Sequence, residues 1–204
     1  MSKLVIINGA SGAGKSFLLE QISSMEHDLV AVKKLTTRSP RINEDVNKSC
    51  DLQFCCSEKK IKAMKYHYQF KNEWYGIDET EIEKVLNKGK YPCIIIRDYP
   101  VLIKLRNNYG KRSLAFYIQG VYSGGDLESL LRKQGRSEQD IIEAVNTNKL
   151  NFNMYYQYMI QDLFEEMDLF DAFIINYYDE KFLGQFEHHI KIDRKRQFME
   201  VQGK

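Results

Sequence analysis

The sequence predicts an α/β fold: three layers with a central parallel five-stranded sheet, an inserted lobe and a helical lid. Short apolar runs alternate with helical patterns along most of the 204 residues, as in parallel sheets that helices cover on both faces. The stretch 37–88 is polar, rich in Tyr and Lys, and lacks this alternation, which indicates an insertion. A chain of this length suits a single domain with a full core.

The expected strands follow from apolar runs that are short and rich in β-branched residues. They are residues 4–8, 29–35, 92–97, 113–118 and 171–176. Asp78 predicts the start of a helix over 79–86, because it can cap the first turn and acidic residues follow it, and Gly89 marks the end. Further helical patterns cover 126–134 and 138–167.

We expect one domain over residues 1–204. Its parts are a core of 1–36, 89–125 and 141–193, an inserted lobe of 37–88, a lid of about 126–140 and a basic tail of 194–204. The 30 Lys and Arg residues nearly balance 28 Asp and Glu residues, so the overall charge indicates neither nucleic-acid nor membrane binding, and the tail is interpreted as solvated. No leader-like segment or membrane-length apolar stretch occurs, which predicts a cytoplasmic protein.

Directly after the first apolar run, the chain matches every position of the phosphate-binding loop G-x-x-x-x-G-K-[ST]. In such a loop, glycines let backbone N–H groups turn onto the phosphates, and the helix that follows points its N-terminus at the anion. The motif predicts a P-loop NTPase fold with a nucleoside triphosphate site. The residues of this site would be Gly9, Ala10, Ser11, Gly12, Ala13, Gly14, Lys15 and Ser16.

Four basic residues crowd nine positions at the end of the second expected strand and in the turn that follows it. They are Lys33, Lys34, Arg38 and Arg41. A surface loop is the usual fate of such a cluster, but Pro40 stiffens the turn between the two arginines. Arginines that are held rigidly lose less entropy when they bind a phosphate with two hydrogen bonds. The cluster is therefore a candidate phosphate-binding site.

The segment 36–44 reads Thr-Thr-Arg-Ser-Pro-Arg-Ile-Asn-Glu and resembles the T-T-R-x-P-R-x-x-E hallmark of guanylate kinases and their relatives. The similarity extends over most of the chain, which is identified as a divergent member of that superfamily. Further segments resemble the family's D-Y-x-F segment, its Y-Y-G turn, a strand that ends in an acidic residue, the lid and the V-x-N element. They are residues 50–54, 73–76, 93–98, 126–142 and 174–176.

The resemblance implies an ATP-dependent kinase that moves the γ-phosphate of ATP to a nucleoside monophosphate, by default GMP or dGMP, with Mg²⁺ as the cofactor. Lys15 and Ser16 would serve ATP and Mg²⁺, and Asn176 would lie near the adenine. Phosphoryl transfer depends on positioning and on neutralising charge. The acceptor would be held by Arg38, Arg41 and Tyr75, with Glu44 bracing the arginines. Asp98 would face the acceptor or its metal shell.

The lid arginines of the family align with Leu130, Gln134 and Val145, so Arg132 and Arg136 are the candidates to replace them. Other departures lie on the acceptor side, where the family has a tyrosine, a guanine-reading glutamate, a serine and a second acidic residue. The residues at those positions are Leu52, Tyr66, Ile77 and Ile96.

These departures leave two alternatives open: a ribose 1,5-bisphosphate kinase and a catalytically weak binding module. The intact segment Gly14-Lys15-Ser16 favours an enzyme. The sequence assigns no oligomeric state.

Overall fold

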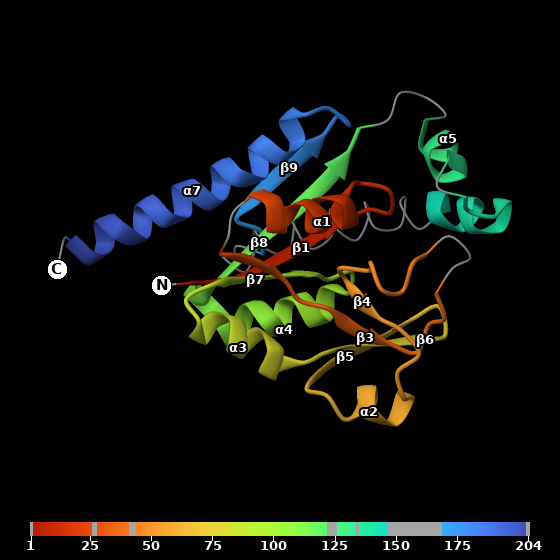
Figure 1. Cartoon of the computed structure of the whole chain (residues 1–204), viewed down its shortest axis with the longest axis horizontal. Coiled ribbons are helices and arrows are strands. Elements are labelled where there is room, and N and C mark those ends of the chain that lie inside the picture. The colour runs from red at the N-terminus through yellow and green to blue at the C-terminus, as the bar shows by residue number, and fades with distance from the viewer. Residues whose placement is uncertain are drawn as a thin grey trace.

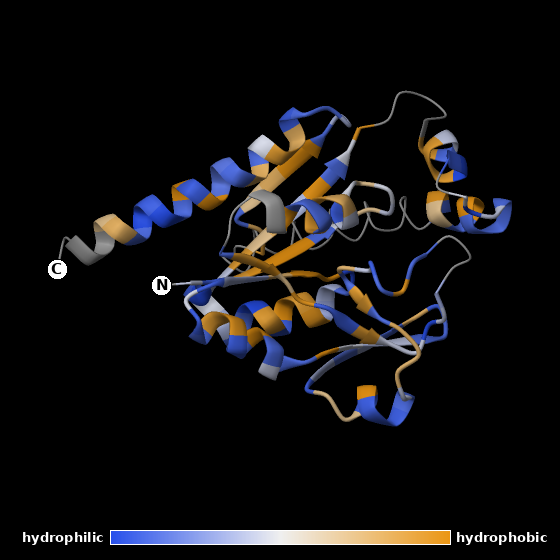
Figure 2. Ribbon diagram, viewed as in Figure 1, coloured by the Kyte–Doolittle hydropathy of each residue, from blue (hydrophilic) through white to orange (hydrophobic). Residues whose placement is uncertain are grey.

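Five parallel strands form the central sheet of the computed structural model, in the order β2-β7-β1-β8-β9 (Figure 1). The structure describes residues 2–25, 28–40, 44–121, 126–133, 135–146 and 169–202. The strands are β1 (Leu4–Gly9), β2 (Leu29–Ala31), β7 (Tyr91–Ile95), β8 (Ser113–Gly120) and β9 (Ala172–Asn176). They are largely hydrophobic (Figure 2), as strands that are buried on both faces must be.

Side chains of the central strand alternate between two core clusters on opposite faces of the sheet. Leu4 and Ile6 pack in the cluster that includes residues of α4 (Tyr99–Tyr109). Val5 and Ile7 pack in the cluster formed with α1 (Lys15–Met25) and α7 (Lys181–Gln202). Helices thus cover both faces of the sheet, and the predicted three-layer α/β fold is confirmed.

The inserted region carries a second sheet of four strands, in the order β4-β3-β6-β5. Its strands are β3 (Lys34–Thr36), β4 (Leu52–Gln53), β5 (Tyr66–Phe70) and β6 (Glu73–Ile77). β5 and β6 form a hairpin whose turn residues, Lys71 and Asn72, both have positive φ (50° and 62°). Such angles are typical of the two-residue turns that match strand twist.

The expected single strand over 29–35 was wrong, because the chain changes sheets inside it. Val32 still donates its N–H to Cys93 O of the central sheet at 2.8 Å, whereas Lys34 donates to Asp51 O of the lobe at 2.9 Å. The polar, exposed Lys33 lies between these two bonds. The sheet of the lobe therefore begins two residues after the last bond to the central sheet.

The remaining helices are short and lie around the two sheets. They are α2 (Glu58–Lys62), α3 (Glu79–Asn87), the 3₁₀ turn η1 (Gly110–Arg112) and α5 (Asp126–Lys133). The predicted cap of α3 is confirmed, since the Asp78 carboxylate accepts the Thr80 N–H at 2.9 Å. Residues 138–146 are also helical; the rest of the helix expected up to 167 lies outside the described residues.

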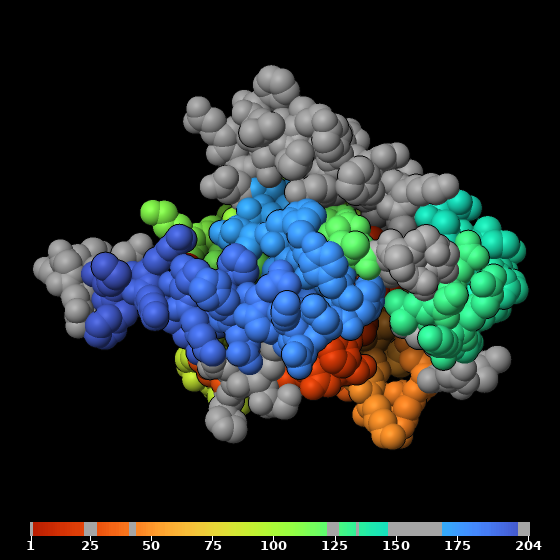
Figure 3. All heavy atoms as spheres, turned by 90° about the horizontal axis from the view of Figure 1, so that it is seen from above, coloured from red at the N-terminus to blue at the C-terminus, as the bar shows by residue number. Residues whose placement is uncertain are grey.

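The tail expected from residue 194 is instead part of α7, a helix of 22 residues. Phe182, Phe186 and Ile190 recur at helical spacing and are buried against the sheet. Arg194 continues this attachment through an ion pair with Asp28 at 2.6 Å. Seen from above, α7 runs along the surface of the molecule (Figure 3). Among the described helices, none is both long and apolar enough to span a membrane.

Candidate active site

The phosphate-binding loop joins β1 to α1, at the carboxyl edge of the central sheet. Gly9 has a φ of 140°, and a Cβ at this position would collide with the carbonyl oxygen of Ile118 on β8. Only glycine lets the loop leave the sheet this close to the neighbouring strand. Ser11, Gly12, Gly14, Lys15 and Ser16 then line a cavity.

Lys15 is buried, and its Nζ donates hydrogen bonds to Gly9 O at 2.7 Å and to Ala10 O. Burial lowers the pKa of this ammonium group well below its ordinary value, and the nearby charges of Arg97 and Lys34 lower it further. An anion beside Nζ would offset both effects. The loop therefore holds a lysine whose charged form a phosphate would stabilise.

The end of β9 braces the loop from the other side. Asn176 is buried, and its side-chain amide donates to Ala13 O at 3.0 Å. The Tyr178 hydroxyl donates to Gly12 O at 2.8 Å, and the Tyr178 N–H donates to Asn176 Oδ1 at 2.7 Å. Both side chains also line the cavity. Asn176 and Tyr178 therefore form part of the cavity wall and also fix the shape of the phosphate-binding loop.

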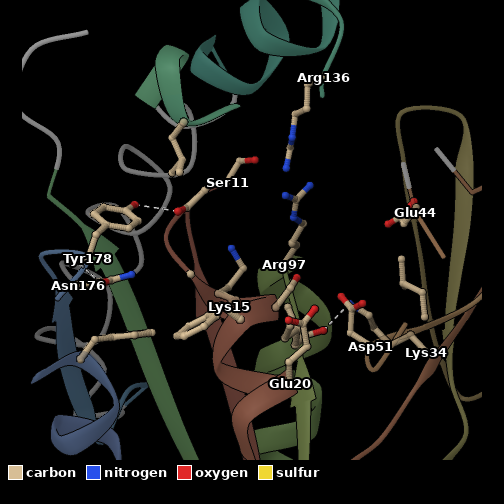
Figure 4. Close-up of a pocket in the computed structure, with 18 of the residues that line it drawn as sticks. Ser11, Lys15, Glu20, Lys34, Glu44, Asp51, Arg97, Arg136, Asn176 and Tyr178 are labelled. Atoms are coloured by element: carbon tan, nitrogen blue, oxygen red, sulfur yellow. Dashed lines mark hydrogen bonds between the residues drawn. The ribbon is translucent and has the colours of Figure 1, made fainter. Parts of the chain in front are cut away.

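A cavity of about 740 Å³ connects the loop to the inserted lobe (Figure 4). Its lobe side carries Arg38, whose two terminal nitrogens each lie 2.8 Å from an oxygen of Glu44. This bidentate ion pair fixes the guanidinium group in one orientation. The Arg38 guanidinium also lies 4.9 Å from the centre of the Phe54 ring. The predicted bracing of Arg38 by Glu44 is therefore present.

An aromatic wall completes the lobe side of the cavity. Tyr75 on β6 stacks on Tyr68 of β5, with ring centres 5.2 Å apart and ring planes 11° apart, and Phe70 continues the same face. Thr37 ties the preceding turn to the hairpin, donating to Glu73 at 2.6 Å and accepting the Trp74 N–H at 3.0 Å. The cavity thus combines a phosphate loop, a braced arginine and a flat aromatic surface.

A family model described as guanylate kinase matches residues 1–170 of the chain. The chain belongs to the guanylate kinase family. It is 28% identical over 178 residues to the guanylate kinase of Porphyromonas gingivalis, covering 83% of this chain and 91% of that protein. It is 26% identical over 148 residues to the guanylate kinase of Bacteroides thetaiotaomicron, covering 70% and 71% of the two chains.

A solved structure of guanylate kinase from Anaplasma phagocytophilum has the same fold, with a TM-score of 0.60 and 18% identity over 96% of this chain and 86% of that one. The predicted family and enzyme class, a nucleoside monophosphate kinase, are thereby confirmed. The two alternatives that the sequence left open, the ribose bisphosphate kinase and the binding module, are not favoured.

The structure separates the two candidate lid arginines of this guanylate kinase family member. Arg136 lines the cavity. Arg132 is exposed and pairs with Glu138 at 2.8 Å and Glu128 at 3.4 Å on the outer side of the lid segment. Of the two, Arg136 is thus the one that the fold directs into the cavity.

Among the described residues, Asp98 and Tyr66 do not line the cavity. Asp98 accepts the Val101 N–H at 2.9 Å and so caps α4, and its predicted contact with the acceptor stays a prediction. Tyr66, at the position of the guanine reader, is buried opposite Ile77 in the hairpin. Arg41 lies outside the described residues.

Sequence reasoning missed Arg97, Tyr68 and Phe70, and it did not separate Lys34 from its exposed neighbour Lys33. The three missed residues and Lys34 all line the cavity. The alternation of Tyr66, Tyr68 and Phe70 was the available signal, because strand residues two apart share a face. For Arg97 the signal was its place at the end of a buried strand, where α/β folds bind ligands.

Proposed function

We propose that the protein transfers the γ-phosphate of ATP to GMP or dGMP. The observation that carries this proposal is the single cavity that runs from the complete phosphate-binding loop to Arg38 and Tyr75 in the lobe. Phosphoryl transfer requires the donor and acceptor phosphates to lie side by side, and the protein contributes mainly positioning and charge neutralisation.

The loop supplies the donor half. Its backbone N–H groups and the N-terminus of α1 would receive the phosphates of ATP. Lys15 would exchange its hydrogen bonds to Gly9 O and Ala10 O for the β- and γ-phosphate oxygens. Asn176 and Tyr178 would hold the loop in shape, and the end of β9 would border the adenine.

Magnesium would enter with the nucleotide. Ser16 stands in the first turn of α1, is exposed and lines the cavity. Within the described ranges, no group of three His, Cys, Asp or Glu side chains could hold a metal by itself. This fits Mg²⁺, which typically takes few protein ligands and completes its shell with phosphate oxygens and water. Mg²⁺ would neutralise negative charge on the phosphates.

The lobe supplies the acceptor half. Arg38, held by Glu44, and Tyr75 would bind the acceptor phosphate, and we assign Arg41 to the same site from the family motif. Tyr68 offers a stacking surface for a planar base, and the Phe70 ring beside it lies under the Arg97 guanidinium, 5.2 Å from the ring centre. The acceptor would thus be held at both ends, its phosphate beside Arg38 and its base against the wall.

Two further cations lie between the halves. Arg97 extends from the end of β7 and Arg136 from the lid segment, and the two side chains point toward one another above Lys15 (Figure 4). The backbone just before Arg97 is fixed, because the Ile96 N–H donates to Ile7 O at 2.9 Å and the Ile96 carbonyl oxygen accepts from the Asn8 side-chain amide at 2.8 Å. Arg97 and Arg136 would stabilise the charge on the phosphoryl group in transit.

The test is a coupled assay of ADP release with Mg²⁺–ATP and a panel of GMP, dGMP, AMP, CMP, UMP and ribose 1,5-bisphosphate. We expect GMP or dGMP to give the highest rate, and Lys15→Ala to lower it by about 10²-fold or more. The melting temperature of the variant serves as the control for folding. The proposal fails if GMP and dGMP never raise ADP release above the rate without an acceptor.

A further inference from the structure

Lys34 is a buried cation in the cavity that does not belong to the phosphate-binding loop. It begins β3, at the point where the chain passes from the central sheet to the lobe, and it is only 4% exposed. Its side chain lines the cavity on the lobe side, near Asp51 (Figure 4), and Arg38 lines the same cavity. A lysine buried to this degree is uncommon unless a partner offsets the cost of removing its charge from water.

The hydrogen bonds of this ammonium group are incomplete. Nζ donates to Ile95 O, at the end of β7, over 2.6 Å. An ammonium group carries three donors, and within the described part of the chain this is the one acceptor that the Lys34 side chain meets. Its remaining N–H groups therefore have room for acceptors from the cavity, and an unmet buried donor is costly.

The charges around Lys34 are mostly positive. Arg97 at the end of β7 and Arg38 after β3 both lower its pKa, Asp51 before β4 raises it, and burial is the largest effect, bringing the pKa to about 8. The charge of Lys34 in turn lowers the pKa of Lys15 in the phosphate loop. Glu44, the other acid on this side of the cavity, is already engaged by Arg38. Such a group of cations favours an anion as the missing partner.

The neighbouring strand offers no donor at this point. In the parallel pair of β3 and β4, Lys34 lies directly opposite Leu52, so the two side chains share one face of the sheet, and both line the cavity. Leu52 is apolar and nearly buried. Of this pair, only Lys34 can donate to a ligand.

We propose that Lys34 binds the phosphate of the acceptor and makes the site selective for a phosphorylated ligand over the free nucleoside. Its remaining N–H groups donate to the phosphate oxygens on the side opposite Arg38. The identity of the acceptor rests on the proposed function, but the existence of an anion site at Lys34 does not. A test of anion binding at Lys34 can therefore fail while GMP phosphorylation is observed, and the reverse.

The direct test is calorimetric titration of inorganic phosphate into protein whose loop is saturated with Mg²⁺ and a non-hydrolysable ATP analogue. We expect Lys34→Met to weaken phosphate binding by about tenfold or more, because a charged hydrogen-bond donor is lost. Lys33→Met removes the same charge from the adjacent, exposed position outside the cavity lining, and it should stay within about twofold of the wild type.

Lys34→Arg, which keeps the charge, should recover part of the affinity, and thermal melting of each variant verifies the fold. Equal phosphate affinity in the wild type and in Lys34→Met, or no phosphate binding by the wild type, would overturn the proposal.

The pH dependence gives a second readout that a purely structural lysine would not move. Lys34 is charged below a pH of about 8 and loses its proton above it, so wild-type phosphate affinity should fall as the pH rises through 8. Lys34→Arg should remove this decline, since arginine keeps its proton. Absence of GMP phosphorylation would refute the proposed function only, whereas an unchanged decline in Lys34→Arg would refute the role of Lys34.

Discussion

The position of Arg136 is set by a turn at the preceding residue, Gly135. Gly135 has a φ of 69°, and the N–H groups of Gly135 and Arg136 bond back to Arg132 O at 2.9 Å and Leu131 O at 3.2 Å. This left-handed glycine ends α5 and turns the chain. Leu131 packs with Ile141 in a small separate core, which holds the two helical arms of the lid segment together. A local turn therefore decides which arginine reaches the cavity.

We expect Arg136→Ala to lower kcat by about 10²-fold or more, because arginines that neutralise a transferring phosphoryl group contribute at this scale. Arg132→Ala should cost far less, since its exposed ion pairs with Glu138 and Glu128 lie outside the cavity. Steady-state kinetics with ATP and GMP separate the two. A larger loss in Arg132→Ala than in Arg136→Ala would contradict this assignment.

At the scale of elements, two helices beside the site begin at aspartates. Asp78 caps α3 and Asp98 caps α4, each accepting a backbone N–H at 2.9 Å. The carboxylate serves here as an acceptor for N–H groups that the helix itself cannot pair. The sequence indicated the first cap, whereas the second was assigned by resemblance to the acceptor site alone.

Asp98→Ala should lower the free energy of unfolding by about 1 kcal/mol, while Asp98→Asn should cost less, because asparagine caps helices equally well. Chemical denaturation measures both, with Asp78→Ala and Asp78→Asn as the matched pair on α3. Equal losses in the alanine and asparagine variants would show that charge, not capping, sets the effect. Activity of the stable Asp98→Asn variant then tests the predicted contact with the acceptor.

The β5–β6 hairpin shows why the lobe was harder to predict than the core. Its turn, Lys71-Asn72, lacks the glycine that usually marks a two-residue hairpin. The alternation of Tyr66, Tyr68 and Phe70 was present, but polar residues between them obscured it. Which of these rings reaches the cavity depends on packing: Tyr66 lies against the Glu79 end of α3, and Tyr68 stacks on Tyr75.

At the scale of the whole molecule, the final segment completes both the sheet and the phosphate site. The match to the family model covers residues 1–170, yet β9 pairs with β8 along its length and α7 covers one face of the sheet. Asn176 and Tyr178 lie beyond the matched residues. They hold the phosphate-binding loop, which lies near the N-terminus of the chain, by hydrogen bonds to its carbonyl oxygens. The C-terminal segment is thus packed into the same core as the phosphate loop.

Phe186→Ala should lower the free energy of unfolding by about 3–5 kcal/mol, because this side chain is fully buried and packs on Phe116 with ring centres 5.4 Å apart. Phe198→Ala on the same helix is the control, since that ring is 62% exposed, and we expect a change within about 0.5 kcal/mol. Similar losses in the two variants would contradict the packing of α7 described above.

The sequence by itself determined the α/β class, the strands of the central sheet to within a few residues, the phosphate loop and the family. These follow from contiguous patterns: a glycine-rich motif, apolar runs and caps are read along the chain. Only the tertiary structure decided that Lys34 rather than Lys33 lines the cavity, that the Arg97 and Arg136 side chains point toward one another, and that residues 194–202 belong to a helix. Each of these depends on which distant segments pack together, because burial and charge in the cavity are set by neighbours far away in the sequence.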